Sequence, residues 1–377
     1  MKKILVVLMA LVFVAAGVFG ILTLGGKAGD PKETAQTTEA VDSSKPDGVS
    51  ESGDSKNTED ADAGKNDNGS DNTPAEVTGG EDVQDPADQS GSAEGSDIVE
   101  KTLADMSLRD KVCQMMFVRP ESITGIDVVT AAGDTTKAAL EQYPVGGIVY
   151  FAQNMESKDQ VKEMIDNSQS YSKVGLFIST DEEGGMVNRL MNTVGTTYID
   201  SMYNYKDEGI QKAHDNAYTI ASDMAALGFN MDFAPVADVW SNPDNTVIGE
   251  RAYSDDYSQA AELVGSAVKG FEDGDIMCTL KHFPGHGDTA EDSHYSSAYV
   301  KRTKDEIMAD EMQPFTAGID AGAEFVMVGH LIVPDIDELP ATLSYKITTE
   351  MLRNDMHFEG IAITDSLAMS SIADNYG

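Results

Sequence analysis

The stretch Met277-Cys278-Thr279-Leu280-Lys281-His282 places two basic side chains directly after a short apolar run. A run of this length without charges predicts a buried β-strand. Three further apolar runs are also followed directly by polar groups: Leu176–Thr180 by Asp181, Phe325–Val328 by Gly329-His330, and Ile361–Thr364 by Asp365-Ser366. In a barrel of parallel strands these positions meet at one rim, where active sites assemble.

Along the rest of the chain, short apolar runs alternate with amphipathic stretches of helical length. The strand candidates are Met115–Val118, Gly147–Phe151, Leu176–Thr180, Asn230–Phe233, Met277–Leu280, Phe325–Val328 and Ile361–Thr364. The clearest helix candidates are Gln211–Leu227, Ser258–Asp273 and Lys304–Ala321. This alternation predicts an α/β fold with parallel strands and crossover helices. The units fit a (β/α)₈ TIM-type barrel that lacks its eighth strand, with a doubly wound open sheet as the alternative.

The 377 residues divide into three zones of different composition. In residues 1–26, Lys2 and Lys3 precede the uncharged apolar run Ile4–Leu24, which predicts a signal peptide or a retained membrane anchor, and hence export. Residues 27–97 are acidic, rich in Ser, Gly, Asn and Thr, and without Phe, Trp, Tyr, Leu, Ile or Met, so we expect a disordered linker. Residues 98–377 are globular in composition and have the length of one barrel domain.

Charge and cysteine content exclude some classes of function. The formal net charge of −39 argues against a nucleic-acid partner, because phosphates require Lys and Arg. Cys113 and Cys278 both lie in apolar runs, so we expect buried thiols and no disulfide framework.

The richest source of candidate site residues is Lys281–Thr289 together with Asp292-Ser293-His294, which contains three of the six histidines. Asp292 is close enough in sequence to fix the tautomer of His294, which could then act as an acid and a base, although a surface contact is the plain alternative. Asp365 follows a buried strand, where a carboxylate suits nucleophilic attack on an anomeric carbon. Its plain alternative is the N-cap of the next helix.

Lys281 and His282 at a strand end need polar partners. Those partners are either substrate hydroxyls or, for Lys281, an internal salt bridge with Asp181. A divalent metal is a further alternative, and its ligands would be His282, His286, Asp288, Asp292 and His294. The absence of HExxH spacing and the lysine at the entry of this cluster disfavour it, so we expect no metal and no cofactor.

Taken together, Lys281–Thr289 and Asp292-Ser293-His294 resemble the signature of glycoside hydrolase family 3, in its bacterial β-N-acetylglucosaminidase branch. Further blocks resemble the family in the same order along the chain: Asp181–Gly185 with Arg189, Met231–Val239, Val247–Arg251, Pro340–Ser344 and Phe358–Met369. The resemblance covers roughly Met106 to Gly377.

The resemblance implies a retaining, metal-free glycosidase that forms a covalent glycosyl-enzyme. By the same resemblance Asp365 is the nucleophile and His294 is the acid/base, oriented by Asp292. The residues expected to bind the N-acetylhexosamine are Asp181, Arg251, Lys281 and His282. The expected substrate is N-acetylglucosamine in cell-wall fragments, with membrane or wall contact only through the N-terminal segment.

The chain also departs from the family pattern. Met186 stands where many relatives carry arginine, and Thr197–Tyr203 lacks the common Pro-Gly turn, so we expect a reshaped loop there. Relatives continue beyond the position of Gly377, so we expect an incomplete barrel. Two alternative functions remain open at this point, a phosphorylase of the same fold and a wall-tethered carbohydrate-binding protein without catalysis.

Overall fold

The computed structural model describes residues 90–290 and 298–376, with side chains from Asp97 onward. The predicted signal or anchor at 1–26 lies outside the described residues, as does the acidic segment up to residue 89. Within the described part of the chain, no helix is long and apolar enough to cross a membrane.

The structure describes only the last residues of the segment predicted as a linker, and their backbone is helical. Helix α2 runs from Ser90 to Asp105, so its first two turns occupy residues assigned to the linker. Val99 is 1% exposed, which shows that the helix is anchored by burial in its second half. Extending an existing helix is less costly than starting one, and this explains why helical backbone continues upstream into a polar stretch.

The first half of the barrel is a parallel sheet in the order β1-β2-β3. Its strands are β1 (Phe117–Val118), β2 (Gly147–Val149) and β3 (Phe177–Ser179). The register pairs Phe117 with Gly147 and Gly147 with Phe177. All three strands lie within the runs predicted from the sequence.

The second half is a parallel sheet in the order β4-β6-β8. Its strands are β4 (Thr279–Phe283), β6 (Phe325–Val328) and β8 (Ile361–Thr364). The segment predicted as a strand at Asn230–Phe233 connects the two sheets. Met231 donates to the Ile178 carbonyl, and the Asp232 N–H donates to the Met277 carbonyl. A continuous parallel barrel wall therefore runs from β1 to β8, and no ladder joins β8 to β1 in the described residues.

The barrel has two apolar layers. One lies inside the wall and takes alternate residues along the strands or the segments next to them, as the strand period of two requires: Phe117, Val149, Phe151, Phe177, Met231, Phe233, Met277, Phe325, Met327, Ile361 and Ile363. Phe325 packs edge-on against Phe177 at 5.2 Å and against Phe117 at 6.4 Å, so strands of the two sheets meet across the interior. The other layer lies between the wall and the helices.

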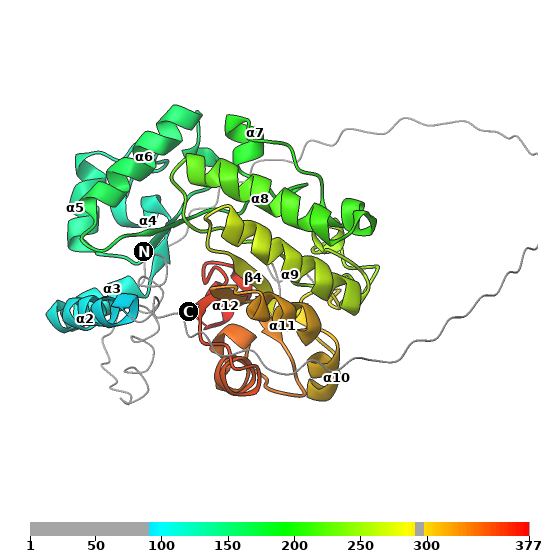
Figure 1. The fold of residues 1–377 in the computed structure, drawn as a ribbon. Coiled ribbons are helices and arrows are strands. Elements are labelled where there is room, and N and C mark those ends of the chain that lie inside the picture. Colours follow the sequence, from blue (N-terminus) through cyan, green and yellow to red (C-terminus); the bar gives the residue numbers. More distant parts are fainter. Residues whose placement is uncertain (1–89, 291–297, 377) are drawn as a thin grey trace, which may run out of the picture. The chain divides into compact units, whose positions relative to one another are not determined.

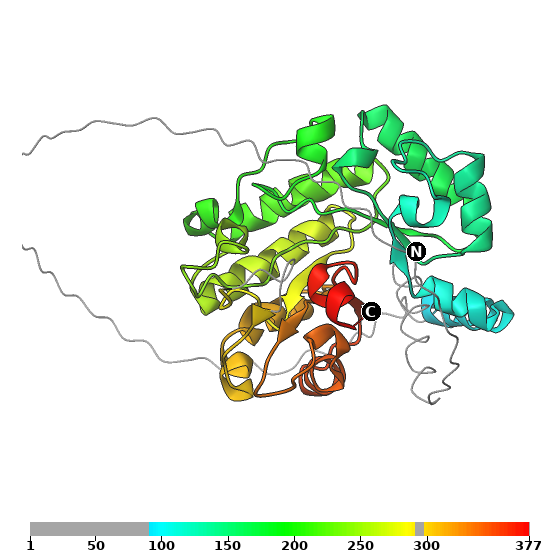
Figure 2. The same cartoon turned by 180° about the vertical axis from the view of Figure 1, so that it is seen from behind.

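The helices lie outside the strands. Helix α8 (Ile210–Ala226) packs on α9 (Tyr257–Asp273), and α9 packs on α11 (Met312–Asp320), in the order of the chain (Figure 1). The first two agree with the predicted helices within one residue at each end. From behind, α12 (Ser370–Tyr376) lies close to the strands (Figure 2).

The prediction of one helix over Lys304–Ala321 was wrong. The chain forms α10 (Lys304–Ala309) and then α11, with a break at Asp310 and Glu311. Pro314 has no N–H to donate to the Asp310 carbonyl, which a continuous helix would require. Both residues at the break form ion pairs with Arg302 instead.

The remaining elements connect these units. Before β4 they are α3 (Leu108–Gln114), α4 (Pro120–Thr124), α5 (Asp134–Gln142), η1 (Ala152–Asn154), α6 (Lys158–Tyr171), α7 (Leu190–Val194), η2 (Met202–Glu208) and η3 (Gly249–Arg251). After β4 they are β5 (Ala298–Tyr299), β7 (Leu331–Ile332), η4 (Ala341–Leu343) and the π-helix η5 (Lys346–Asp355). The parallel β5–β7 pair was not predicted.

Candidate active site

Three consecutive carboxylates follow β3, and the structure gives them different roles. Glu182 accepts hydrogen bonds from the backbone N–H groups of residues 189–191, at 2.5 to 3.0 Å, and so caps the start of α7. Asp181 and Glu183 both face Lys281 instead, one residue to either side of Glu182. The run therefore supplies two carboxylates to the rim and one to the local fold.

The ammonium group of Lys281 is buried between two carboxylates. Its Nζ lies 2.9 Å from Asp181 Oδ1 and 2.6 Å from Glu183 Oε1, and the residue is 1% exposed. Burial by itself would lower the pKa of Lys281, but the charges of Asp181 and Glu183 outweigh it and raise that pKa. The salt bridge considered as the plain alternative is thus present, and Lys281 is a charged group fixed at the rim.

Arg251 belongs to the same ion network. Its Nε and Nη2 each lie 2.8 Å from a different oxygen of Glu183, a two-pronged contact, and its Nη1 donates to the Val247 carbonyl at 2.9 Å. Burial alone would raise the pKa of Glu183, but Arg251 and Lys281 together lower it to about 2. The side chain of Asp181 remains 20% exposed, with Arg189 Nη2 3.7 Å from its second oxygen.

His282 is oriented by a buried carboxylate. Its Nδ1 lies 2.7 Å from Asp238 Oδ2, and the backbone N–H groups of His282 and His286 also donate to Asp238. Burial would raise the pKa of Asp238, but His282 outweighs it and lowers that pKa. Since Nδ1 is engaged and no described group bonds to Nε2, the far side of the ring is available to a ligand.

His286 lies in the same stretch but serves the fold. It is 2% exposed, its Nδ1 lies 2.7 Å from Thr289 Oγ1, and its carbonyl accepts from Asn245 Nδ2 at 2.8 Å. Burial lowers its pKa to about 4, so the ring is neutral near pH 7. We assign it to the support of the turn after β4.

Asp365 comes directly after β8 and is partly exposed. Its N–H donates to the Val328 carbonyl at 2.9 Å, which extends the pairing with β6 by one residue. Burial opposes its ionisation, but the nearby His282, the Ser366 N–H, His330 and Lys281 outweigh burial and lower the pKa of Asp365. Because α12 begins only at Ser370, Asp365 is not at its N-cap position.

The structure thus assembles five of the seven predicted site residues at the carboxyl ends of the strands: Asp181, Arg251, Lys281, His282 and Asp365. The other two, Asp292 and His294, lie outside the described residues. No group of three His, Cys, Asp or Glu side chains that could hold a metal occurs in residues 97–290 or 298–376. Asp292 and His294, two of the five candidate metal ligands, lie outside that range.

Sequence reasoning missed three residues that organise the site. Glu183 was not predicted as a site residue, although the buried cations Arg251 and Lys281 both form ion pairs with it. Asp238, the partner of His282, is a charged residue inside the apolar stretch Met231–Val239, which could have marked it. His330 was noted at a strand end and bonds through Nε2 to the Ser366 carbonyl at 2.8 Å, beside Asp365.

Fold and site together define a class: an α/β-barrel protein with a network of charged groups at the carboxyl rim, the position of active sites in such barrels. The profile described as "Glycosyl hydrolase family 3 N terminal domain" matches residues 107–377. The chain therefore belongs to glycosyl hydrolase family 3.

Three relatives show how far the similarity extends. The chain is 34% identical over 256 residues to beta-hexosaminidase A of Pseudoalteromonas piscicida, covering 62% of this chain and 43% of that protein. It is 33% identical over 241 residues to a beta-hexosaminidase of Stenotrophomonas maltophilia, covering 62% and 70%. A family 3 beta-N-acetylglucosaminidase structure from Paenibacillus sp. superposes with a TM-score of 0.68 at 35% identity, covering 72% of this chain and 51% of that one. The chain thus spans about half the length of two of these relatives.

Proposed function

We propose that this protein is a retaining exo-β-N-acetylglucosaminidase that removes terminal β-N-acetylhexosamine residues. The observation that carries the proposal is an ionised Asp365 on the same rim as the Lys281–Glu183–Arg251 network and His282. Family membership and the beta-N-acetylglucosaminidase relatives support the reaction class.

In the first step an oxygen of Asp365 bonds to the anomeric carbon while the bond to the aglycone oxygen breaks. Because the pKa of Asp365 is lowered, the carboxylate is in its nucleophilic form at neutral pH. His294 donates the proton that the leaving oxygen takes up, with Asp292 orienting the ring. In the second step His294 takes a proton from water, whose oxygen displaces Asp365 and restores the original configuration.

The remaining predicted residues bind the sugar in this proposal. Asp181 keeps an exposed oxygen for a hydroxyl, and His282 presents Nε2 because Asp238 holds Nδ1. Lys281 contributes positive charge close to the reacting carboxylate. Arg251 acts mainly by holding Glu183, since its guanidinium is already bonded on three nitrogens.

We further propose that the natural substrates are N-acetylglucosamine units of peptidoglycan-derived fragments, met after export. The support is the sequence of residues 1–26, in which two lysines precede an uncharged apolar run, and the acidic segment that follows it. A protein held at the membrane or released from the cell would encounter wall fragments directly.

The test is release of p-nitrophenol from the β-N-acetylglucosaminide, with and without inorganic phosphate. We expect hydrolysis that phosphate does not accelerate, and a loss of several orders of magnitude in kcat for Asp365→Asn. Asp374→Asn, an exposed carboxylate on α12, is the matched control. Equal activity in the two variants would contradict the proposal, and phosphate-dependent turnover would favour a phosphorylase.

The acid role of His294 has its own test, because only poor leaving groups need a proton. His294→Ala should slow glycosyl transfer from a disaccharide far more than from an activated aryl glycoside. Equal losses on both substrates would remove His294 from that role.

A further inference from the structure

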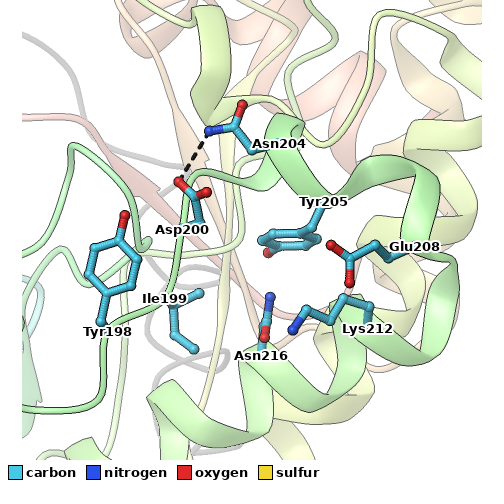
Figure 3. Close-up of a pocket in the computed structure, with 8 residues that line it drawn as sticks. All are labelled: Tyr198, Ile199, Asp200, Asn204, Tyr205, Glu208, Lys212 and Asn216. Carbon is cyan, nitrogen blue, oxygen red and sulfur yellow. Dashed lines mark hydrogen bonds between the residues drawn. The ribbon is translucent and has the colours of Figure 1, made fainter.

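The connection between β3 and α8 lines an open cavity of about 250 Å³ that the proposed reaction does not use. Figure 3 shows its lining side chains, which come from residues 198–208 and the first turns of α8. The ones that decide its chemistry are Tyr198, Asp200, Asn204, Tyr205, Glu208 and Lys212. We call this cavity the Tyr198–Lys212 pocket.

The inner part of the pocket is already fixed by internal contacts. Tyr205 is 4% exposed and packs edge-on against Tyr253, with ring centroids 6.4 Å apart. Asp200 accepts from Asn204 Nδ2 at 3.1 Å and from the Ser201 N–H at 2.7 Å (Figure 3). A ligand would therefore meet walls that are held in place before it arrives, which lowers the entropic cost of binding.

The charges of the pocket select the kind of ligand. The Glu208 carboxylate and the Lys212 ammonium both line it, and neither is in a hydrogen bond or ion pair with another described residue. Asp200 and Glu208 would repel a phosphate, and Lys212 offsets part of their attraction for a metal cation. A neutral polyhydroxyl ring satisfies both signs, because each hydroxyl can donate to a carboxylate and accept from an ammonium.

Two further features favour a sugar. Tyr198 is 69% exposed at the pocket, so its ring offers a face for the apolar C–H side of a pyranose. The volume is below the roughly 300–1,000 Å³ of pockets for drug-sized ligands, which limits the occupant to about one ring.

The pocket and the ion network share one connection. The Gly185 N–H donates to the Ile199 carbonyl at 2.9 Å, and Gly184-Gly185 directly follow Glu183. The pocket wall also falls in Thr197–Tyr203, where the sequence departs from the family pattern. Part of the cavity wall is therefore built by a segment that lacks the Pro-Gly turn common in the family.

We propose that the Tyr198–Lys212 pocket is a second carbohydrate subsite, which binds one sugar ring of a glycan. The choice of N-acetylglucosamine as that sugar rests on the proposed function. The role of the subsite is to hold a glycan or wall fragment on the protein independently of the reacting ring.

The experiment follows the methyl signals of Ile199 and Ile363 by NMR during titration with a sulfur-linked disaccharide of N-acetylglucosamine. The sulfur linkage is not hydrolysed. Ile199 lines the pocket, and Ile363 on β8 lies two residues before Asp365. We expect both methyl signals to shift. In the double variant Tyr198→Ala, Lys212→Met, the dissociation constant reported by Ile199 should rise at least tenfold, and that reported by Ile363 should stay within twofold.

Tyr218→Ala is the matched control, because Tyr218 is an exposed tyrosine on α8 outside the pocket lining. An Ile199 signal that does not respond, or that responds equally in the double variant, overturns the subsite. So does an equal response to inorganic phosphate alone. A response of Ile199 in a protein without p-nitrophenol release would leave the subsite standing and remove the proposed function, so the two failures are distinguishable.

Discussion

At the scale of single residues, the site depends on charges that are buried in pairs. Lys281 and Glu183 are each almost fully buried, and without the other each would keep only one ion-pair partner in a low-dielectric interior. Such a pair does more for the arrangement of the site than for net stability, since both ions lose their hydration on folding. Its geometry fixes Asp181 and Arg251 at the same rim.

Removal of one partner should therefore be costly. We expect Lys281→Met to lower the free energy of unfolding by about 3–5 kcal/mol, because Glu183 loses a partner in the interior. In the double variant with Glu183→Gln, the free energy of unfolding should fall by less than the sum of the decreases in the two single variants. Urea denaturation measures these values, and Lys162→Met, at an exposed ion pair with Asp166, is the control with an expected change below about 0.5 kcal/mol. If Lys281→Met lowered the free energy of unfolding no more than the control variant does, the buried ion network would be contradicted.

The neutral His286 makes a second prediction, on pH. Its folded-state pKa of about 4 lies below the ordinary 6.5, so the unfolded chain binds a proton that the folded protein excludes. Its contribution is complete above pH 6.5 and is lost as the pH falls toward 4. Between pH 7.5 and 5, His286→Gln should lose about 2 kcal/mol less unfolding free energy than the unmodified protein.

His214 provides the control of opposite sign. Hydrogen bonding to Asp273 raises its pKa, so its stabilisation is present below pH 6.5 and is lost as the pH rises through the raised value. His214→Gln should therefore steepen the loss toward pH 5. If the free energy of unfolding depended on pH in the same way in both variants, the assignment of His286 as a buried neutral ring would be refuted.

At the scale of elements, the turn after β4 is held by close backbone packing. A Cβ on Gly287 would overlap the carbonyl group of Val239, and the Gly287 carbonyl accepts from Asn242 and Asn245. The position is therefore closed to any side chain for steric reasons. This turn contains His286 and directly follows β4, the strand that carries His282.

Gly287→Ala should lower the free energy of unfolding by about 1–3 kcal/mol and reduce kcat/KM, because the overlap displaces the turn. Gly175→Ala is the matched control, since a Cβ there meets nothing within 4 Å. The control should be neutral or stabilising by a few tenths of a kcal/mol. Denaturation and p-nitrophenol release measure both effects, and equal behaviour of the two variants would rule out the steric account.

Sequence patterns predicted some elements better than others, for physical reasons. Most strands were located because each is a short apolar run bounded by polar residues, as at Ile361–Thr364 before Asp365. The end of β4 was predicted wrongly, because this strand continues past Leu280 through Lys281 and His282 to Phe283. The break at Asp310 was missed because periodicity alone does not register a proline's lost N–H. The β5–β7 pair was missed because two-residue strands leave no periodic signal.

The candidate site was predictable where the chemistry lies next to a strand end. Asp365 directly follows β8 and Asp181 comes two residues after β3, whereas Lys281 and His282 are the third and fourth residues of β4. Asp238 was missed because its importance comes from a contact with His282, 44 residues away in the sequence. Pairings over such distances depend on the register of the barrel wall, which local patterns do not determine.

At the scale of the whole molecule, the interior aromatic residues join the two sheets. Phe325 on β6 contacts Phe117 and Phe177 of the other sheet and is 0% exposed. We expect Phe325→Ala to lower the free energy of unfolding by about 3–5 kcal/mol, through lost burial and the cavity left behind. Tyr345→Ala, at a 65% exposed aromatic, should stay within about 0.5 kcal/mol. Similar losses in urea denaturation would show that the interior contact does not join the barrel.

We propose above all that the rim of this barrel performs glycosyl transfer through Asp365. The most direct measurement uses an aryl β-N-acetylglucosaminide that carries fluorine on its sugar ring, because this fluorine slows hydrolysis of the glycosyl-enzyme and so traps the intermediate. Mass spectrometry of proteolytic peptides then locates the adduct. We expect one fluorinated N-acetylhexosaminyl group on the peptide that contains Asp365, and none in Asp365→Asn. An adduct on another residue, or turnover with inverted configuration at the anomeric carbon, would contradict it.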